Sequence, residues 1–101
     1  MKVRFRQTGG FGGLVLGCDL DTTSLSQTDG LRLISLVEQA RLEEIGIRKE
    51  ERGRDLTSYE VVVEEAGKTL RALVNDMSTL PRLDPLLEFL RSRARAVPLD
   101  D

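Results

Sequence analysis

The sequence predicts an α+β fold: a four-stranded antiparallel sheet with two helices on one face, in the order ββαββα. Two pairs of segments alternate apolar and polar residues, and a glycine-containing connection joins the members of each pair. A stretch with apolar residues at helical spacing follows each pair. Period two is typical of half-buried strands, and a spacing of three or four is typical of amphipathic helices. Consecutive elements usually pack as neighbours, so both helices are expected on a single face.

The first predicted hairpin surrounds a glycine-rich connection. Val3 and Phe5 alternate with basic residues, and the apolar period resumes after the glycines at Leu14, Leu16, Cys18 and Leu20. Two such runs joined by a short glycine-rich segment indicate a hairpin. The segment 21–24 is turn-like, and helical spacing runs from about Gln27 to Glu44. The residues expected near one face of this helix are Leu33, Leu36, Val37, Ala40 and Arg41.

The second half repeats the order of the first. Gly46 and the charged stretch Arg48 to Asp55 are expected to end the helix and form an exposed loop that tolerates substitution. Alternating residues 59–64 and 70–74 predict a second hairpin around a tight turn at 65–68. A final helix carries Leu83, Leu86, Leu87, Phe89 and Leu90, with Pro81 or Pro85 in its first turn and Arg91, Arg93 and Arg95 near its end. The predicted core includes Leu16, Val37, Val61, Val74 and Leu86.

Length and composition favour one soluble domain over residues 1–101. The chain has 101 residues, 40% hydrophobic and 32% charged, with 15 basic and 17 acidic side chains. A net charge of −2 and four aromatic residues (three Phe and one Tyr) disfavour a nucleic-acid partner. No apolar run is long enough to span a membrane, so no membrane partner is expected. A single cysteine allows no intramolecular disulfide, and a cytoplasmic location is expected.

The residues that carry catalysis are scarce. The chain contains no histidine, which removes the commonest general base and the commonest zinc ligand. Asp19 and Asp21 are two residues apart at a strand end, but a solvated strand end and turn explain them better than a carboxylate pair does. Cys18 occupies an apolar-face position and is interpreted as a small core residue. The sequence therefore predicts a binding protein without cofactor or metal, and not an enzyme.

The most unusual segment is Gly9-Gly10-Phe11-Gly12-Gly13. It leads into a strand, whereas phosphate-binding loops lead into a helix, so a phosphate site is rejected. One interpretation is that Phe11 folds back over the sheet edge and the glycines only make the bend. The other is that Phe11 is an exposed anchor on a slim backbone that enters a deep slot of a partner.

The stretch Thr8-Gly9-Gly10-Phe11-Gly12-Gly13-Leu14 after a first strand resembles the emfourin-like (protealysin inhibitor) family, small protein inhibitors of thermolysin-type zinc metalloproteases. Further likeness lies in Asp21-Thr22, in Asp55 with Tyr59-Glu60-Val61, in Leu80-Pro81, and in the segment Leu86 to Leu90. Gly12 departs from the alanine expected in the family, and the segment Arg48 to Arg54 is a second place where relatives are expected to differ.

The resemblance implies a protein that occupies the active-site cleft of such a protease. It implies that Phe11 fills the pocket for the bulky apolar side chain just after the scissile bond. The protease-binding residues would be Thr8, Gly9, Gly10, Phe11, Gly12, Gly13 and Leu14. Contact with the zinc through a carboxylate or through a backbone carbonyl is compatible with this arrangement, and the sequence does not choose between them.

A different class of function is a protein-interaction or regulatory module that uses the open face of the sheet. Arg4, Arg6 and Glu60 are predicted on that face. A sheet that binds RNA or a small molecule ranks lower, because the predicted open face lacks aromatic residues for stacking.

Overall fold

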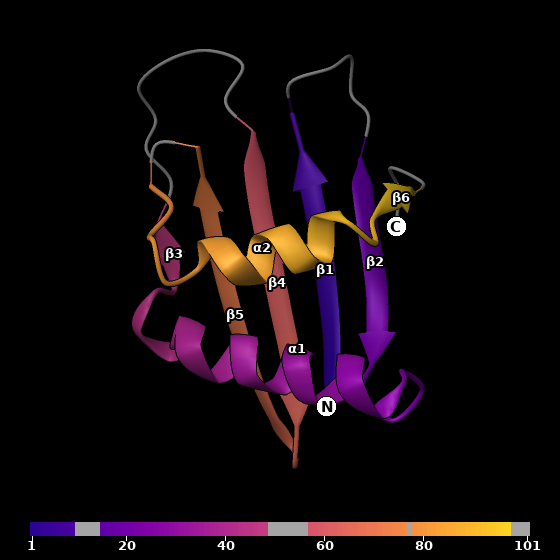
Figure 1. Cartoon of the computed structure of the whole chain (residues 1–101). Coiled ribbons are helices and arrows are strands. Elements are labelled where there is room, and N and C mark those ends of the chain that lie inside the picture. The colour runs from indigo at the N-terminus through magenta and orange to yellow at the C-terminus, as the bar shows by residue number, and fades with distance from the viewer. Residues whose placement is uncertain (10–14, 49–56, 77, 98–101) are drawn as a thin grey trace.

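The computed structural model describes residues 1–9, 15–48, 57–76 and 78–97 (Figure 1). The elements, in chain order, are β1 (Lys2–Thr8), β2 (Leu16–Asp21), α1 (Gln27–Ala40), the 3₁₀ helix η1 (Leu42–Glu44), β3 (Ile47–Arg48), β4 (Ser58–Glu65), β5 (Lys68–Asn75), α2 (Asp84–Arg91) and β6 (Arg95–Ala96).

The described strands form one mixed sheet in the order β3-β5-β4-β1-β2-β6. Each of its four long strands is antiparallel to the long strand beside it, as predicted. The prediction of a purely antiparallel, four-stranded sheet was wrong, because β3 pairs with β5 in parallel and β6 pairs with β2. Both additions have only two residues, too few to display alternation in the sequence. β3 includes Arg48, which had been assigned to the charged loop, while the rest of that predicted loop lies outside the described residues.

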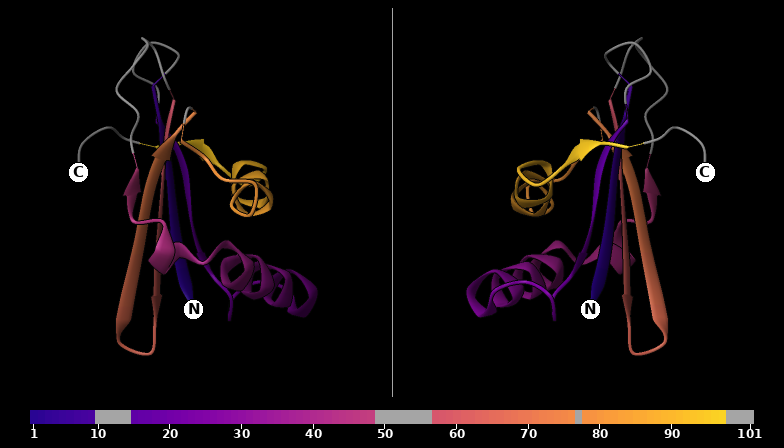
Figure 2. Two further views of the ribbon diagram at one scale, coloured as in Figure 1. Left: turned by 90° about the vertical axis from the view of Figure 1, so that its left-hand side faces the viewer. Right: turned by 90° about the vertical axis from the view of Figure 1, so that its right-hand side faces the viewer.

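Both helices pack on one face of the sheet, and the other face carries no helix among the described residues (Figure 2). Alternate residues of the long strands meet the helices, and Phe5, Leu33, Leu86 and Leu90 are fully enclosed. Four of the five residues predicted for the core are buried: Val37, Val61, Val74 and Leu86. The prediction for Leu16 was wrong, because it is only half-buried. Leu16 begins β2, and the contact of β2 with α2 comes two residues later, where Cys18 Sγ lies 3.6 Å from the carbonyl oxygen of Leu90.

Helix α1 begins as the sequence predicts and ends earlier. The Ser26 hydroxyl caps it by accepting a hydrogen bond from the Asp29 N–H at 3.1 Å. Helix α1 ends at Ala40, because Arg41 adopts a left-handed conformation with φ of 51°. Arg41 is therefore exposed, and its predicted place on the buried face was wrong. The change of direction brings Leu42 and Ile45 into the core instead.

The second hairpin and α2 follow the prediction closely. Ala66 and Gly67 join β4 to β5 with φ of 52° and 78°, the two positive values of a type I′ turn. Pro85 lies in the first turn of α2, where a missing N–H costs little, and Arg91 lies in its last turn. Arg95, expected near the end of the helix, belongs to β6.

Replacing Leu86 by alanine should lower the free energy of unfolding by about 2–5 kcal/mol, because its side chain is 0% exposed and the change leaves a cavity. Leu16→Ala is the matched control and should cost about 1 kcal/mol or less, since Leu16 is partly solvated already. Urea unfolding of the two variants measures both values. Equal costs would contradict the different burial of the two leucines.

Candidate functional site

The glycine-rich segment begins and ends at one end of the sheet. Thr8 closes β1 and pairs with Ser58, the first residue of β4, which in turn pairs with Asn75, the last residue of β5. We call this the loop end of the sheet and define it by Thr8, Gly9, Val15, Leu16, Thr57, Ser58, Asn75 and Asp76 (upper end in Figure 1). Of the predicted protease-binding residues, Thr8 and Gly9 belong to it. Gly10, Phe11, Gly12, Gly13 and Leu14 lie outside the described residues.

The two ends of the segment are held by neighbouring strands. Thr8 is exposed and is the last residue of β1 to pair with β4. Gly9 follows with φ of 94°, a backbone conformation that residues with a side chain rarely adopt, so this position requires glycine. On the far side of the segment, the buried Val15 accepts a hydrogen bond through its carbonyl from the Val97 N–H at 2.9 Å. Both stems are therefore fixed relative to the sheet.

A polar clamp around Asp76 fixes the start of β4 beside Thr8. Its carboxylate accepts hydrogen bonds from the Tyr59 hydroxyl at 2.7 Å and from the Thr57 N–H at 3.1 Å. Its own N–H donates to the Thr57 carbonyl at 3.0 Å. Burial of the ring, and then the hydrogen bond to Asp76, raise the pKa of Tyr59. Nothing in the local sequence relates Asp76 to Thr57, because the two residues are 19 positions apart in the chain.

The open face of the sheet is dominated by pairs of opposite charge. Arg6 Nη1 donates to Asp19 Oδ1 at 3.0 Å, Arg4 Nε lies 3.4 Å from the same carboxylate, and Arg71 pairs with Glu60. The hydrogen bond with Arg6 is the main reason that the pKa of Asp19 is lowered. Arg4, Arg6 and Glu60 therefore lie on the predicted face, with much of their charge compensated by neighbours in the sheet.

Gly17 makes the position of Arg6 possible. A Cβ atom on Gly17 would lie 2.5 Å from the Phe5 carbonyl oxygen and 2.7 Å from Arg6 Nη1, closer than atoms can pack. Without that atom, the guanidinium lies across β2 and also donates to the Phe5 carbonyl at 2.7 Å. The sequence alone does not predict this close approach, because it depends on the register that pairs Arg6 with Gly17.

The other candidate chemical groups have structural partners. Asp21 Oδ1 accepts hydrogen bonds from the N–H and the hydroxyl of Thr23, and the backbone bond is the main cause of its lowered pKa. Cys18 is half-buried against α2, and this burial is the first cause of its raised pKa. The positive charges of Arg6 and Arg93 act in the opposite direction and lower the pKa.

Within residues 1–9, 15–48, 57–76 and 78–97, no three side chains of the metal-ligating types gather into a group able to hold a metal ion. No helix in the same part of the chain has the length and apolar character required to cross a membrane.

The described residues form a small α+β domain, and Gly9 and Val15, which flank the glycine-rich segment, both lie at one end of its sheet. Residues 5–91 match the Emfourin family, and the chain therefore belongs to that family. The match confirms the resemblance drawn from the glycine-rich segment, and the family is known as one of metalloprotease inhibitors. No curated protein and no solved structure matches the chain significantly.

The clamp predicts a loss of stability at alkaline pH. The folded state raises the pKa of Tyr59 above its ordinary value of 10.0, so folding favours the neutral phenol. This contribution is complete below the pKa of the unfolded chain and disappears as the pH rises through the higher pKa of the folded chain. Tyr59 is the only tyrosine, so absorbance of the phenolate measures its pKa directly.

Tyr59→Phe provides the control for this pH dependence. At neutral pH it should cost about 0.5–1.5 kcal/mol of unfolding free energy, because one hydrogen bond to Asp76 is lost. The difference between wild type and variant should shrink as the pH rises above 10.0. Urea unfolding across that range measures it, and a difference independent of pH would contradict the role given to the phenol.

Proposed function

We propose that this protein inhibits a thermolysin-type zinc metalloprotease by placing residues 9–13 in the active-site cleft. Membership of the Emfourin family is the observation that carries the proposal, since that family is known for metalloprotease inhibitors. The position of the segment supports it, because both stems lie at one exposed end of the sheet. In this proposal the protein is a non-catalytic partner of the protease and acts in the cytoplasm, in keeping with its single cysteine.

The stems supply preorganisation. A loop whose ends are fixed loses less conformational freedom on binding than one that hangs from mobile strands, so more of the contact energy becomes affinity. The register between Thr8 and Ser58 fixes one stem, and the hydrogen bond from Val97 to Val15 fixes the other. Glycines flanking Phe11 would let the backbone approach the floor of the cleft while the aromatic ring enters the pocket for an apolar side chain.

Phe11→Ala should weaken inhibition by about 2–4 kcal/mol, roughly 30- to 1000-fold, as truncation of a central anchor residue does. It should leave the free energy of unfolding nearly unchanged, because an exposed anchor adds little to the core. Titration of a thermolysin-type protease with the wild type and the variant, together with urea unfolding, measures both quantities. A Phe11 that packs back onto the sheet would give the reverse pattern: lower stability and intact inhibition.

Arg4→Ala on the open face is the matched control for this titration. Its side chain is 61% exposed, and the change should leave inhibition intact. Loss of inhibition by Arg4→Ala with none by Phe11→Ala would instead favour an interaction module that uses the open face. Absence of inhibition by the wild type would reject the protease proposal itself.

Gly10→Val tests the slimness of the segment. Valine should weaken inhibition by at least about 10-fold. A β-branched side chain disfavours positive φ, and it would hold the backbone away from the cleft floor. Inhibition constants of Gly10→Val and of Gly10→Ala, measured side by side, separate bulk from the loss of glycine alone. Wild-type inhibition by the valine variant would contradict close backbone approach.

A further inference from the structure

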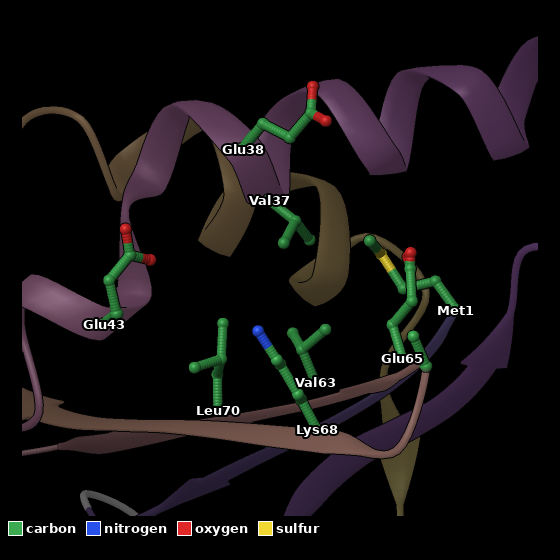
Figure 3. Close-up of a pocket in the computed structure, with 9 residues that line it drawn as sticks. Met1, Val37, Glu38, Glu43, Val63, Glu65, Lys68 and Leu70 are labelled. Atoms are coloured by element: carbon green, nitrogen blue, oxygen red, sulfur yellow. The ribbon is translucent and has the colours of Figure 1, made fainter.

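A second surface with binding character lies at the end of the sheet opposite to the loop end. There, a cleft of about 620 Å³ separates α1 from the turn of the β4–β5 hairpin (Figure 3). Its apolar lining comes from Met1, Val37, Val63, Ala66 and Leu70. Figure 3 shows Val37 of α1 facing Leu70 and Val63 across the cleft.

The charges around this cleft are mostly negative and form no ion pairs within the described part of the chain. Three carboxylates and one amine line it: Glu38, Glu43, Glu65 and Lys68. Glu43 and Glu65 lie at opposite ends of the cleft in Figure 3. None of the four makes an ion pair with another described residue, in contrast to the paired charges of the open face. The remaining cation nearby, the Met1 ammonium, donates to the Thr22 hydroxyl at 3.2 Å.

The strand that borders the cleft also has an unpaired edge. β3 pairs with β5 only at Leu73 and Val74, and no other described strand pairs with β5 on that side. The Leu73 N–H points toward this edge, since it donates to the Gly46 carbonyl at 2.9 Å. Backbone direction alternates along a strand, so the N–H groups of Thr69 and Arg71 point toward the same edge. Below β3, that edge has no neighbouring strand in the left view of Figure 2.

We infer that a partner protein adds an extended segment to the free edge of β5 and inserts an apolar side chain into this cleft beside Leu70. Addition of a strand to a sheet edge draws affinity from backbone hydrogen bonds and specificity from pockets for alternate side chains. Residues two positions to either side of the inserted one face the same way. Lysine or arginine at those two positions matches the carboxylates of Glu43 and Glu65.

The negative charge of the cleft disfavours anionic ligands. A nucleic acid or an anionic lipid surface would meet three carboxylates against one amine. The site is separate from the proposed inhibitory segment, because β4 and β5 each run eight residues from the loop end to the hairpin turn. One partner at each end can therefore bind at the same time, and the inference does not depend on protease inhibition.

The test is a titration of the ¹⁵N-labelled full chain, followed by amide chemical shifts, with a capped seven-residue peptide. The peptide has leucine at its centre, lysine two residues to either side, and threonine elsewhere. Shifts are expected at Thr69, Leu70 and Arg71. A matched peptide with glutamate in place of both lysines should bind at least about 10-fold more weakly. This difference in affinity should diminish at high salt.

Two sets of variants separate the backbone edge from the charges. Thr69→Pro removes the N–H that points toward the free edge of β5, and edge strands tolerate proline at such a position. This variant should abolish the chemical-shift changes, whereas Thr69→Val should retain them. Replacing Glu38, Glu43 and Glu65 together by glutamine should weaken the lysine peptide roughly 5- to 30-fold, because each exposed pair contributes little alone. Thermal unfolding verifies that each variant is folded. If the proline variant does not fold, the glutamine variant still tests whether the carboxylates contribute to peptide binding.

Three results would overturn the inference. The first is absence of binding by the wild type, and the second is equal binding of the lysine and glutamate peptides. The third is a set of shifts confined to the loop end or to the open face. Inhibition of a protease is measured separately, so these results leave the proposed function unaffected.

Discussion

Burial of a single face of the sheet is the constraint on which the rest of the structure depends. Phe5 of β1 is 0% exposed and belongs to the same hydrophobic core as Leu33 of α1 and Leu86 of α2. A slip of one residue in any long strand would turn its apolar side chains to solvent, so the register is strongly specified. That register sets where each long strand ends. It therefore also sets the positions of the two stems of the glycine-rich segment and of the free edge of β5.

The opposite face has a different role because the helices leave it uncovered. Arg6 reaches Asp19 across Gly17, and Arg71 pairs with Glu60, so these charges are compensated within the sheet. Exposed pairs of this kind add little stability, about 0–1 kcal/mol each, but they reduce the charge available to a partner. Our two proposals assign binding instead to the two ends of the sheet: to the segment that follows Gly9, and to the apolar cleft whose carboxylates pair with no cation among the described residues.

The sequence predicted the parts of the fold whose stability comes from long, regular burial. The four long strands and α2 are long enough for their apolar residues to repeat several times at the expected spacing. The positive φ values of Ala66 and Gly67 agree with the tight turn that the sequence predicted there. β3 and β6 could not be predicted, since each consists of two residues defined only by the strand that it joins. The early end of α1 at Arg41 was missed for a related reason: burial of Leu42 and Ile45 outweighs continued helical spacing.

The candidate site divides in the same way. Composition alone pointed to Gly9 and its neighbours, because glycines around one aromatic residue are conspicuous in any sequence. The Asp76 clamp was invisible, since Asp76 and Tyr59 are 17 residues apart and meet only through the register of β4 with β5. In the proposed inhibition, the clamp matters as much as the glycines do. In the proposed complex, glycine would give the segment the freedom to follow a narrow cleft, and ordering each such residue would cost about 1–2 kcal/mol. A loop this permissive can bind tightly only if its stems do not add to that cost. In this chain, Asp76 holds Thr57 at the start of β4, where Ser58 pairs with Thr8, so in our proposal a hydrogen-bonded end of the sheet carries the glycine-rich segment.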